Sequence, residues 1–255
     1  MIRRFKLIAT GIFCALLAAG CSAMTPGDVN QVEATSDQPN AGNVYLLRGF
    51  IGIWSFGIND ITKKINDSGV RANVYQENQW DEVCNAIIAK YQNNPNHEPL
   101  VVIGHSYGAD DALKMAKKLQ QHNITIDLVI TLDPVTPPKV PTNIRLCYNI
   151  YQPSALDMLP FFRGVPLEAE ETGNLQNVNI RGDRRDLLEP NTDHFNIEKN
   201  TLIHAEIVKK VKEFCPPRAA WAAAHQPNLA KAPINGVQTL SNVTASGNSH
   251  PTRSE

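Results

Sequence analysis

The feature that most constrains this chain is the pentapeptide Gly104-His-Ser-Tyr-Gly108. The four apolar residues Leu100–Ile103 precede it, and residues 109–119 follow with the apolar spacing of a helix. This setting predicts a strand, a very tight turn and a helix. Bulk two places to either side of the serine would clash in such a turn, so glycine is needed at both ends of the motif. We therefore expect Ser106 to lie at the carboxyl edge of a sheet and at the N-terminus of a helix.

Short apolar runs alternate with longer amphipathic runs through the middle of the chain. The expected strands are residues 43–47, 71–75, 100–103, 128–132, 144–151 and 178–180. The expected helices are residues 58–65, 80–91, 109–119 and 203–214, where apolar residues recur at spacings of three and four. This alternation predicts an α/β fold with a mostly parallel central sheet and helices on both faces. Ligands of such sheets bind beyond the carboxyl ends of the strands, so we expect the chemistry there.

The first 20 residues have the layout of an export signal. A positive segment containing Arg3, Arg4 and Lys6 precedes an apolar stretch at 7–17, and small residues follow. The run Leu17-Ala-Ala-Gly-Cys21 is similar to a bacterial lipobox, whose cysteine becomes the lipidated first residue of the mature protein. We therefore expect a signal peptide at 1–20 and a lipid anchor on Cys21, which would hold the protein at a membrane of the cell envelope, on its periplasmic or outer surface. The alternative is a plain signal peptide and a soluble secreted protein.

Composition divides the rest of the chain. Residues 21–42 are rich in small and polar residues, which predicts a flexible tether. Residues 43–215 are expected to form the compact domain. Residues 216–255 are expected to form a disordered tail with a short helix near 219–224.

The formal net charge of −1 gives no basic excess that would favour nucleic acid as a partner. Cys84, Cys147 and Cys215 form no Cys-x-x-Cys pair, so no metal site is expected, and one disulfide among them stays open.

A serine at neutral pH needs a base to take its proton. Among the histidines that follow Ser106, His194 lies in a loop between the last expected strand and the last expected helix, where its ring could reach the serine. The acid that would orient this imidazole is Asp133, directly after the strand at 128–132, with Asp157 as the competitor. An oxyanion formed during attack needs N–H donors, and the backbone of Tyr107 is one candidate. The other is the N–H of Phe50, with Ile51 as an alternative, in the apolar loop after the first strand.

Four segments together carry a resemblance to a known family. They are Leu46-Leu-Arg-Gly49, Gly104-His-Ser-Tyr-Gly-Ala109, Leu132-Asp-Pro134 and Asp193-His-Phe195. They resemble the α/β-hydrolase superfamily, and most of all its small bacterial lipase-like and thioesterase-like members. The resemblance implies an α/β-hydrolase fold, a Ser106–His194–Asp133 triad, an acyl ester or thioester as substrate, a covalent acyl-enzyme, and no cofactor. Two departures are Ala109, where many relatives have a second glycine, and an acid that follows an earlier strand than in most of the superfamily. They keep open a second hypothesis, a catalytically inactive binding protein with the same fold.

Overall fold

A six-stranded, entirely parallel sheet forms the centre of the computed structural model, which describes residues 27–49, 55–94, 96–153 and 164–225. The strand order is β2-β1-β3-β4-β5-β6. The strands are β1 (Asn43–Leu47), β2 (Arg71–Tyr75), β3 (Leu100–His105), β4 (Ile126–Leu132), β5 (Ile144–Tyr151) and β6 (Leu175–Asn179). The predicted parallel sheet is confirmed. The strands β3 and β4 are each two residues longer than expected, and the last strand is shifted to Leu175–Asn179 from the expected 178–180.

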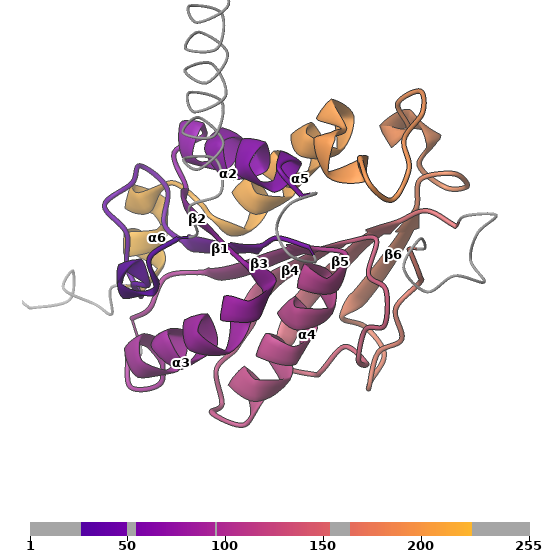
Figure 1. The fold of residues 1–255 in the computed structure, drawn as a ribbon. Helices are drawn as coiled ribbons and strands as arrows, with labels where there is room; N and C mark the ends of the chain where they lie inside the picture. Colours follow the sequence, from indigo (N-terminus) through magenta and orange to yellow (C-terminus); the bar gives the residue numbers. More distant parts are fainter. Residues whose placement is uncertain (1–26, 50–54, 95, 154–163, 226–255) are drawn as a thin grey trace, which may run out of the picture.

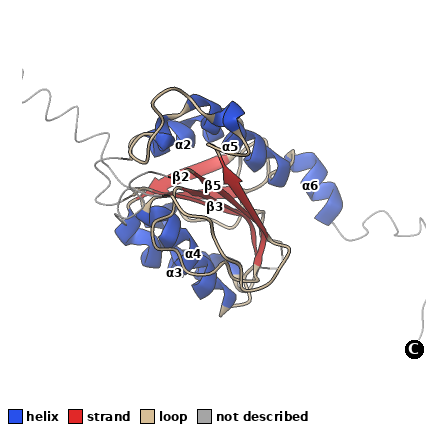
Figure 2. Ribbon diagram, turned by 90° about the vertical axis from the view of Figure 1, so that its right-hand side faces the viewer, coloured by secondary structure: helices blue, strands red, loops and turns tan. Residues whose placement is uncertain are grey.

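Helices cover both faces of the sheet (Figures 1 and 2). The helices α2 (Gly57–Asp67) and α5 (Thr201–Phe214) lie on one face, and α3 (Trp80–Tyr91) and α4 (Tyr107–Gln120) lie on the other. Short 3-10 helices occur at η1 (Val29–Gln31), η3 (Glu77–Gln79), η5 (Arg185–Leu187) and η6 (Ile197–Lys199), and α6 (Arg218–His225) follows α5. The four large helices expected from the sequence are therefore present.

Alternate residues of the central strands supply two separate cores. In β1, Val44 and Leu46 pack with α2 and α5, whereas Tyr45 and Leu47 pack with α3 and α4. This is the period-two alternation of a strand with both faces covered by helices. Every residue of β1 and β3 is buried, as the continuous apolar runs predict.

The packed part of the chain extends beyond 43–215 at both ends. The expectation of a flexible tether up to residue 42 is wrong for residues 27–42, because Val32 and Ala34 are buried in the core that holds α3 and α4. The short helix expected near 219–224 is present as α6, whereas the expectation of a disordered tail is wrong for residues 216–225. The buried Glu98 joins the two ends: its carboxylate pairs with Arg218 and accepts the backbone N–H of Gly42 at 2.8 Å. Residues 1–26 and 226–255, including Cys21, lie outside the described residues.

Burial raises the pKa of the Cys84, Cys147 and Cys215 thiols to about 12, and all three are free. The disulfide that the sequence left open does not form among them. Within the described ranges, no helix is long and apolar enough to cross a bilayer. The same residues contain no group of three or more His, Cys, Asp or Glu side chains that could hold a metal ion.

Candidate active site

Ser106 lies in the turn between β3 and α4, with φ 56° and ψ −124°. This backbone conformation is strained for a residue with a side chain, and such strain concentrates at functional sites. The flanking glycines allow this tight turn, because neither has a side chain that would clash with the backbone. A Cβ at Gly104 would lie 2.1 Å from the carbonyl oxygen of Gly108, and a Cβ at Gly108 would lie 2.3 Å from that of Arg48. The turn therefore has room for no side chain at either glycine.

His194 meets Ser106 from a loop far away in the sequence. The Oγ of Ser106 and the Nε2 of His194 are 3.0 Å apart, within hydrogen-bond distance. Both side chains are buried, at 7% exposure each. The imidazole is therefore placed where it could take the hydroxyl proton.

Asp133 completes the group on the far side of the imidazole. Its Oδ2 lies 3.4 Å from the Nδ1 of His194, which makes no hydrogen bond of good geometry among the described residues. Contacts of this kind are often long in proteins without substrate and tighten when it binds. The carboxylate itself is firmly held, since Gln152 donates its backbone N–H to Oδ1 at 2.8 Å and its side-chain amide to Oδ2 at 3.3 Å. Asp133 is fully buried and has φ 46°, a second strained residue in this group.

Arg181 joins the loop that carries the acid to the loop that carries the histidine. Its Nη2 donates to the Oε1 of Gln152 at 2.7 Å and to the backbone carbonyl of Thr192 at 2.7 Å. The amide that holds Asp133 is thus itself oriented, and the same guanidinium fixes the chain two residues before His194.

Asp110 holds the segment after Asp133. It lies in the first turn of α4, and its carboxylate accepts the backbone N–H groups of Val135 at 3.0 Å and Thr136 at 2.8 Å. Burial raises the pKa of this carboxyl. The helix that begins beside Ser106 therefore fixes the loop that begins with Asp133.

The structure describes part of the expected oxyanion site. Tyr107 is the first residue of α4, and N–H groups in a first helical turn point toward the helix N-terminus, beside Ser106. The expected donors Phe50 and Ile51 lie outside the described residues, as does the competing acid Asp157. Sequence reasoning missed Gln152, Arg181 and Asp110, although Asp110 had a signal: it is a carboxylate on the buried side of α4.

The order of the parallel strands and the serine turn between β3 and α4 together identify the fold. The chain has an α/β-hydrolase fold. A family model, the thioesterase domain, matches residues 61–145, from within α2 to the start of β5. This range includes Ser106 and Asp133 but not His194. A search of curated proteins finds no significant match.

Solved structures with a similar fold include several hydrolases. Est1E from Butyrivibrio proteoclasticus is 13% identical, with a TM-score of 0.43, over 69% of this chain and 89% of that one. XC6422 from Xanthomonas campestris, described as an α/β serine hydrolase without a lid, is 14% identical, with a TM-score of 0.41, over 71% and 85%. The RedJ thioesterase of the prodiginine biosynthetic pathway of Streptomyces coelicolor is 10% identical, with a TM-score of 0.42, over 73% and 88%.

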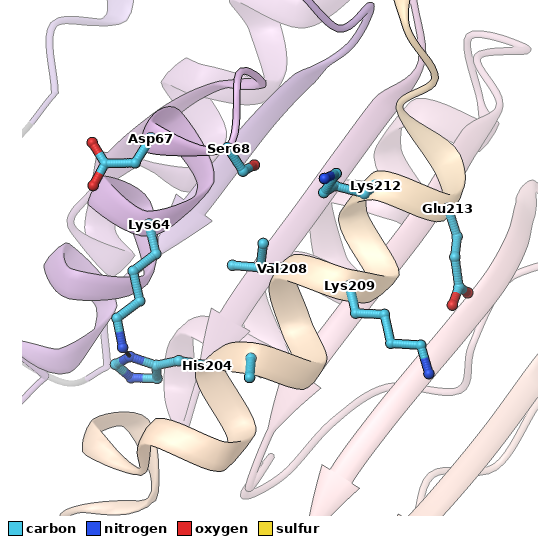
Figure 3. A pocket seen from close by; sticks show the side chains of 9 residues that line it. Lys64, Asp67, Ser68, His204, Val208, Lys209, Lys212 and Glu213 are labelled. Carbon is cyan, nitrogen blue, oxygen red and sulfur yellow. Dashed lines mark hydrogen bonds between the residues drawn. The ribbon is translucent and has the colours of Figure 1, made fainter.

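A pocket of about 810 Å³ lies away from these residues, between α2 and α5 (Figure 3). Its lining includes Lys64, Val208 and Lys212, and none of the Ser106, His194 and Asp133 side chains. Among the lining residues, Lys64 donates to the Nδ1 of His204 at 2.8 Å, which joins α2 to α5 (Figure 3). The pocket is therefore separate from the candidate active site.

Proposed function

We propose that the protein is a serine hydrolase that cleaves carboxylic ester or thioester bonds through an acyl-enzyme intermediate. The observation that carries this proposal is the 3.0 Å contact between the Oγ of Ser106 and the Nε2 of His194, made by a serine in a strained turn at a helix N-terminus. Asp133, on the other side of the ring, supplies the negative charge that a protonated imidazole needs. The thioesterase family model agrees with this class of reaction.

Each side chain then has a defined step. His194 accepts the proton of Ser106 at Nε2 while Oγ attacks the carbonyl carbon, and the N–H of Tyr107 stabilises the negative charge on the oxygen. His194 next donates that proton to the leaving alcohol or thiol, which leaves the acyl group on Oγ. A water molecule then attacks the acyl carbon while His194 takes its proton at Nε2. His194 gives this proton to the departing Oγ of Ser106, which releases the carboxylic acid and restores the serine hydroxyl.

A fluorophosphonate probe and a p-nitrophenyl ester test this proposal together. We expect the wild-type protein to be labelled on Ser106 and to hydrolyse the ester, and Ser106→Ala to lose both, with a fall in kcat of at least ~10³-fold. The Ser106→Ala protein should keep its circular dichroism spectrum. A wild-type protein that is neither labelled nor active, beside a known serine hydrolase that is labelled, would favour the inactive binding protein. A series of acyl chain lengths, offered as esters and as thioesters, would then define the substrate.

We also propose that the protein works at a membrane of the cell envelope, through a lipid anchor on Cys21. The support is the N-terminal sequence, in which a positive segment, an apolar stretch and the run Leu17–Cys21 follow one another. Metabolic labelling with a radioactive fatty acid should mark the wild-type protein in the membrane fraction but not Cys21→Ser. If Cys21→Ser stays equally labelled and membrane-bound, the anchor is not at this cysteine.

A further inference from the structure

His105 is a buried histidine that the proposed reaction does not use. It is the last residue of β3, directly before Ser106, and it is only 3% exposed. Its ring centroid lies 5.5 Å from that of His194. Both ring nitrogens have partners: Nε2 is 3.0 Å from the backbone carbonyl oxygen of His194, and Nδ1 is 2.9 Å from the Oγ of Ser55.

The direction of every hydrogen bond in this group can be assigned. A carbonyl oxygen only accepts, so Nε2 of His105 carries the hydrogen and donates to His194. In the neutral ring Nδ1 is then an acceptor, and the hydroxyl of Ser55 donates to it. The Oγ of Ser55 in turn accepts the backbone N–H of Gly49 at 3.0 Å. One chain of donors therefore runs from Gly49 through Ser55 and His105 to the carbonyl of His194.

This chain connects three segments that the proposed reaction needs. Gly49 opens the loop after β1, where the second oxyanion donor is expected, and His105 adjoins the nucleophile. A Cβ on Gly49 would lie 2.8 Å from the Oγ of Ser55, so this close approach depends on glycine. The carbonyl of His194 belongs to the residue whose ring must stay 3.0 Å from Ser106.

The buried setting keeps the chain intact over a wide pH range. Burial and the neighbouring His194 lower the pKa of His105 to about 3, so the His105 ring stays neutral at neutral and mildly acidic pH. A protonated His105 would have a second N–H and would lose the hydrogen bond from Ser55.

We propose that His105 is a positioning residue, which fixes the backbone of His194 and, through Ser55, the start of the loop after β1. This inference rests on the proposed function, because it assigns a role in placing the base of that reaction. Misplacement of a reacting group by about 1 Å costs ~10²-fold in rate, which sets the size of the expected effect.

Two substitutions separate the two bonds of His105. A glutamine amide nitrogen reaches roughly the place of Nε2, and an asparagine oxygen roughly the place of Nδ1. His105→Gln therefore retains the donor to His194, and His105→Asn retains only the acceptor for Ser55. We expect His105→Asn to lower kcat for a p-nitrophenyl ester by ~10²-fold with KM within about twofold, and His105→Gln to stay within about fivefold of the wild-type kcat.

His204→Asn is the matched control. His204 is equally buried, at 2% exposure, and its Nε2 also donates to a backbone carbonyl, that of Glu198, at 2.7 Å. This variant should lower the unfolding midpoint as much as His105→Asn does but leave kcat nearly unchanged. Ser55→Ala provides a milder variant in case His105→Asn does not fold, and we expect it to lower kcat by about tenfold.

The outcomes distinguish this inference from the proposed function. A low kcat for His105→Asn, together with a kcat for His105→Gln within about fivefold of the wild type, supports the positioning role. If the folded His105→Asn and Ser55→Ala proteins keep kcat within about threefold, or if His204→Asn loses as much kcat as His105→Asn, the positioning role is wrong and the proposed function stands. If the wild-type protein itself shows neither labelling nor turnover, both are wrong.

Discussion

The substitution Asp133→Asn tests the acid of the candidate triad without changing its shape. The Oδ1 of Asp133 accepts the backbone N–H of Gln152 at 2.8 Å, and this donor is fixed in the main chain. An asparagine must therefore keep its oxygen at that position and place its NH₂ group where Oδ2 is now, 3.4 Å from the Nδ1 of His194. An amide NH₂ only donates, so Nδ1 would become the acceptor and the ring hydrogen would move to Nε2.

The size of the effect follows from this tautomer. With a hydrogen on Nε2, His194 has no lone pair to accept the proton of Ser106 at 3.0 Å. A wrong tautomer in a Ser-His-Asp enzyme costs ~10⁴-fold in kcat, which corresponds to about 5 kcal/mol of transition-state free energy. KM should change little, because Asp133 is fully buried and has no surface for the substrate.

Steady-state hydrolysis of a p-nitrophenyl ester is the assay, with circular dichroism to show that the variant folds. Asp157→Asn is the parallel variant, because Asp157 is the competing acid, and we expect it to stay within about twofold of the wild-type kcat. Two results would refute the reasoning from Asp133. One is a folded Asp133→Asn protein that keeps more than about a tenth of the wild-type kcat; the other is a larger loss of kcat in Asp157→Asn than in Asp133→Asn.

Three further predictions concern the residues around the site. Gly108→Ala would place a Cβ 2.3 Å from the carbonyl oxygen of Arg48, and we expect chemical denaturation to show a loss of ~1–3 kcal/mol in the free energy of unfolding; an unchanged value would contradict the packing of the turn. Gly164→Ala would place a Cβ 1.9 Å from the Oδ1 of Asp133, so ester kinetics should show kcat reduced by ~10²-fold, and a normal kcat would mean that the acid need not stay in place. Burial raises the pKa of Glu198 from 4.5 to about 7, so the native state holds this proton more tightly than the unfolded state, and the contribution of this residue to stability falls as the pH rises from about 4.5 to 7. Urea denaturation should therefore show Glu198→Gln gaining up to ~3 kcal/mol relative to the wild type between pH 4.5 and pH 8, and a constant difference across that range would be the contrary result.

The sequence was sufficient where the cause of a structure is local. The strand β1 has the predicted bounds, because an apolar run of that length between turn residues fits a covered parallel sheet. The turn at Ser106 followed from the steric demand of its two glycines. His194 and Asp133 were placed by the rule that chemistry gathers after the carboxyl ends of the strands, and the structure brings both to Ser106.

The sequence was insufficient where the cause is a contact between distant segments. Arg218 and Glu98 are 120 residues apart, and their pairing packs a segment whose composition alone indicated disorder. The same applies to Arg181, whose bond to Gln152 spans 29 residues. No spacing rule identifies such partners, since they depend on how the sheet brings the strand ends together.

The register of the sheet explains why an acid after β4 can serve this site. His105 at the end of β3 pairs with Leu132 at the end of β4, so Ser106 and Asp133 are the next residues on neighbouring strands. The ladder continues through both: Ser106 donates its N–H to Leu132 at 2.9 Å, and Asp133 donates its N–H to Ile150 at 2.9 Å. Adjacent strands lie about 4.8 Å apart, so the sheet itself sets the distance between serine and acid.

With the serine and the acid fixed by the sheet, the position of the imidazole depends on the loop of His194. This loop has no strand to hold it, and side chains from other elements take that role. Arg181 binds the carbonyl of Thr192, and His105 binds the carbonyl of His194. Both bonds fix the main chain and leave the imidazole edges free for Ser106 and Asp133. Substitutions of Arg181 and His105 should therefore act on kcat through the placement of one ring, and their effects should be less than additive when the two are combined.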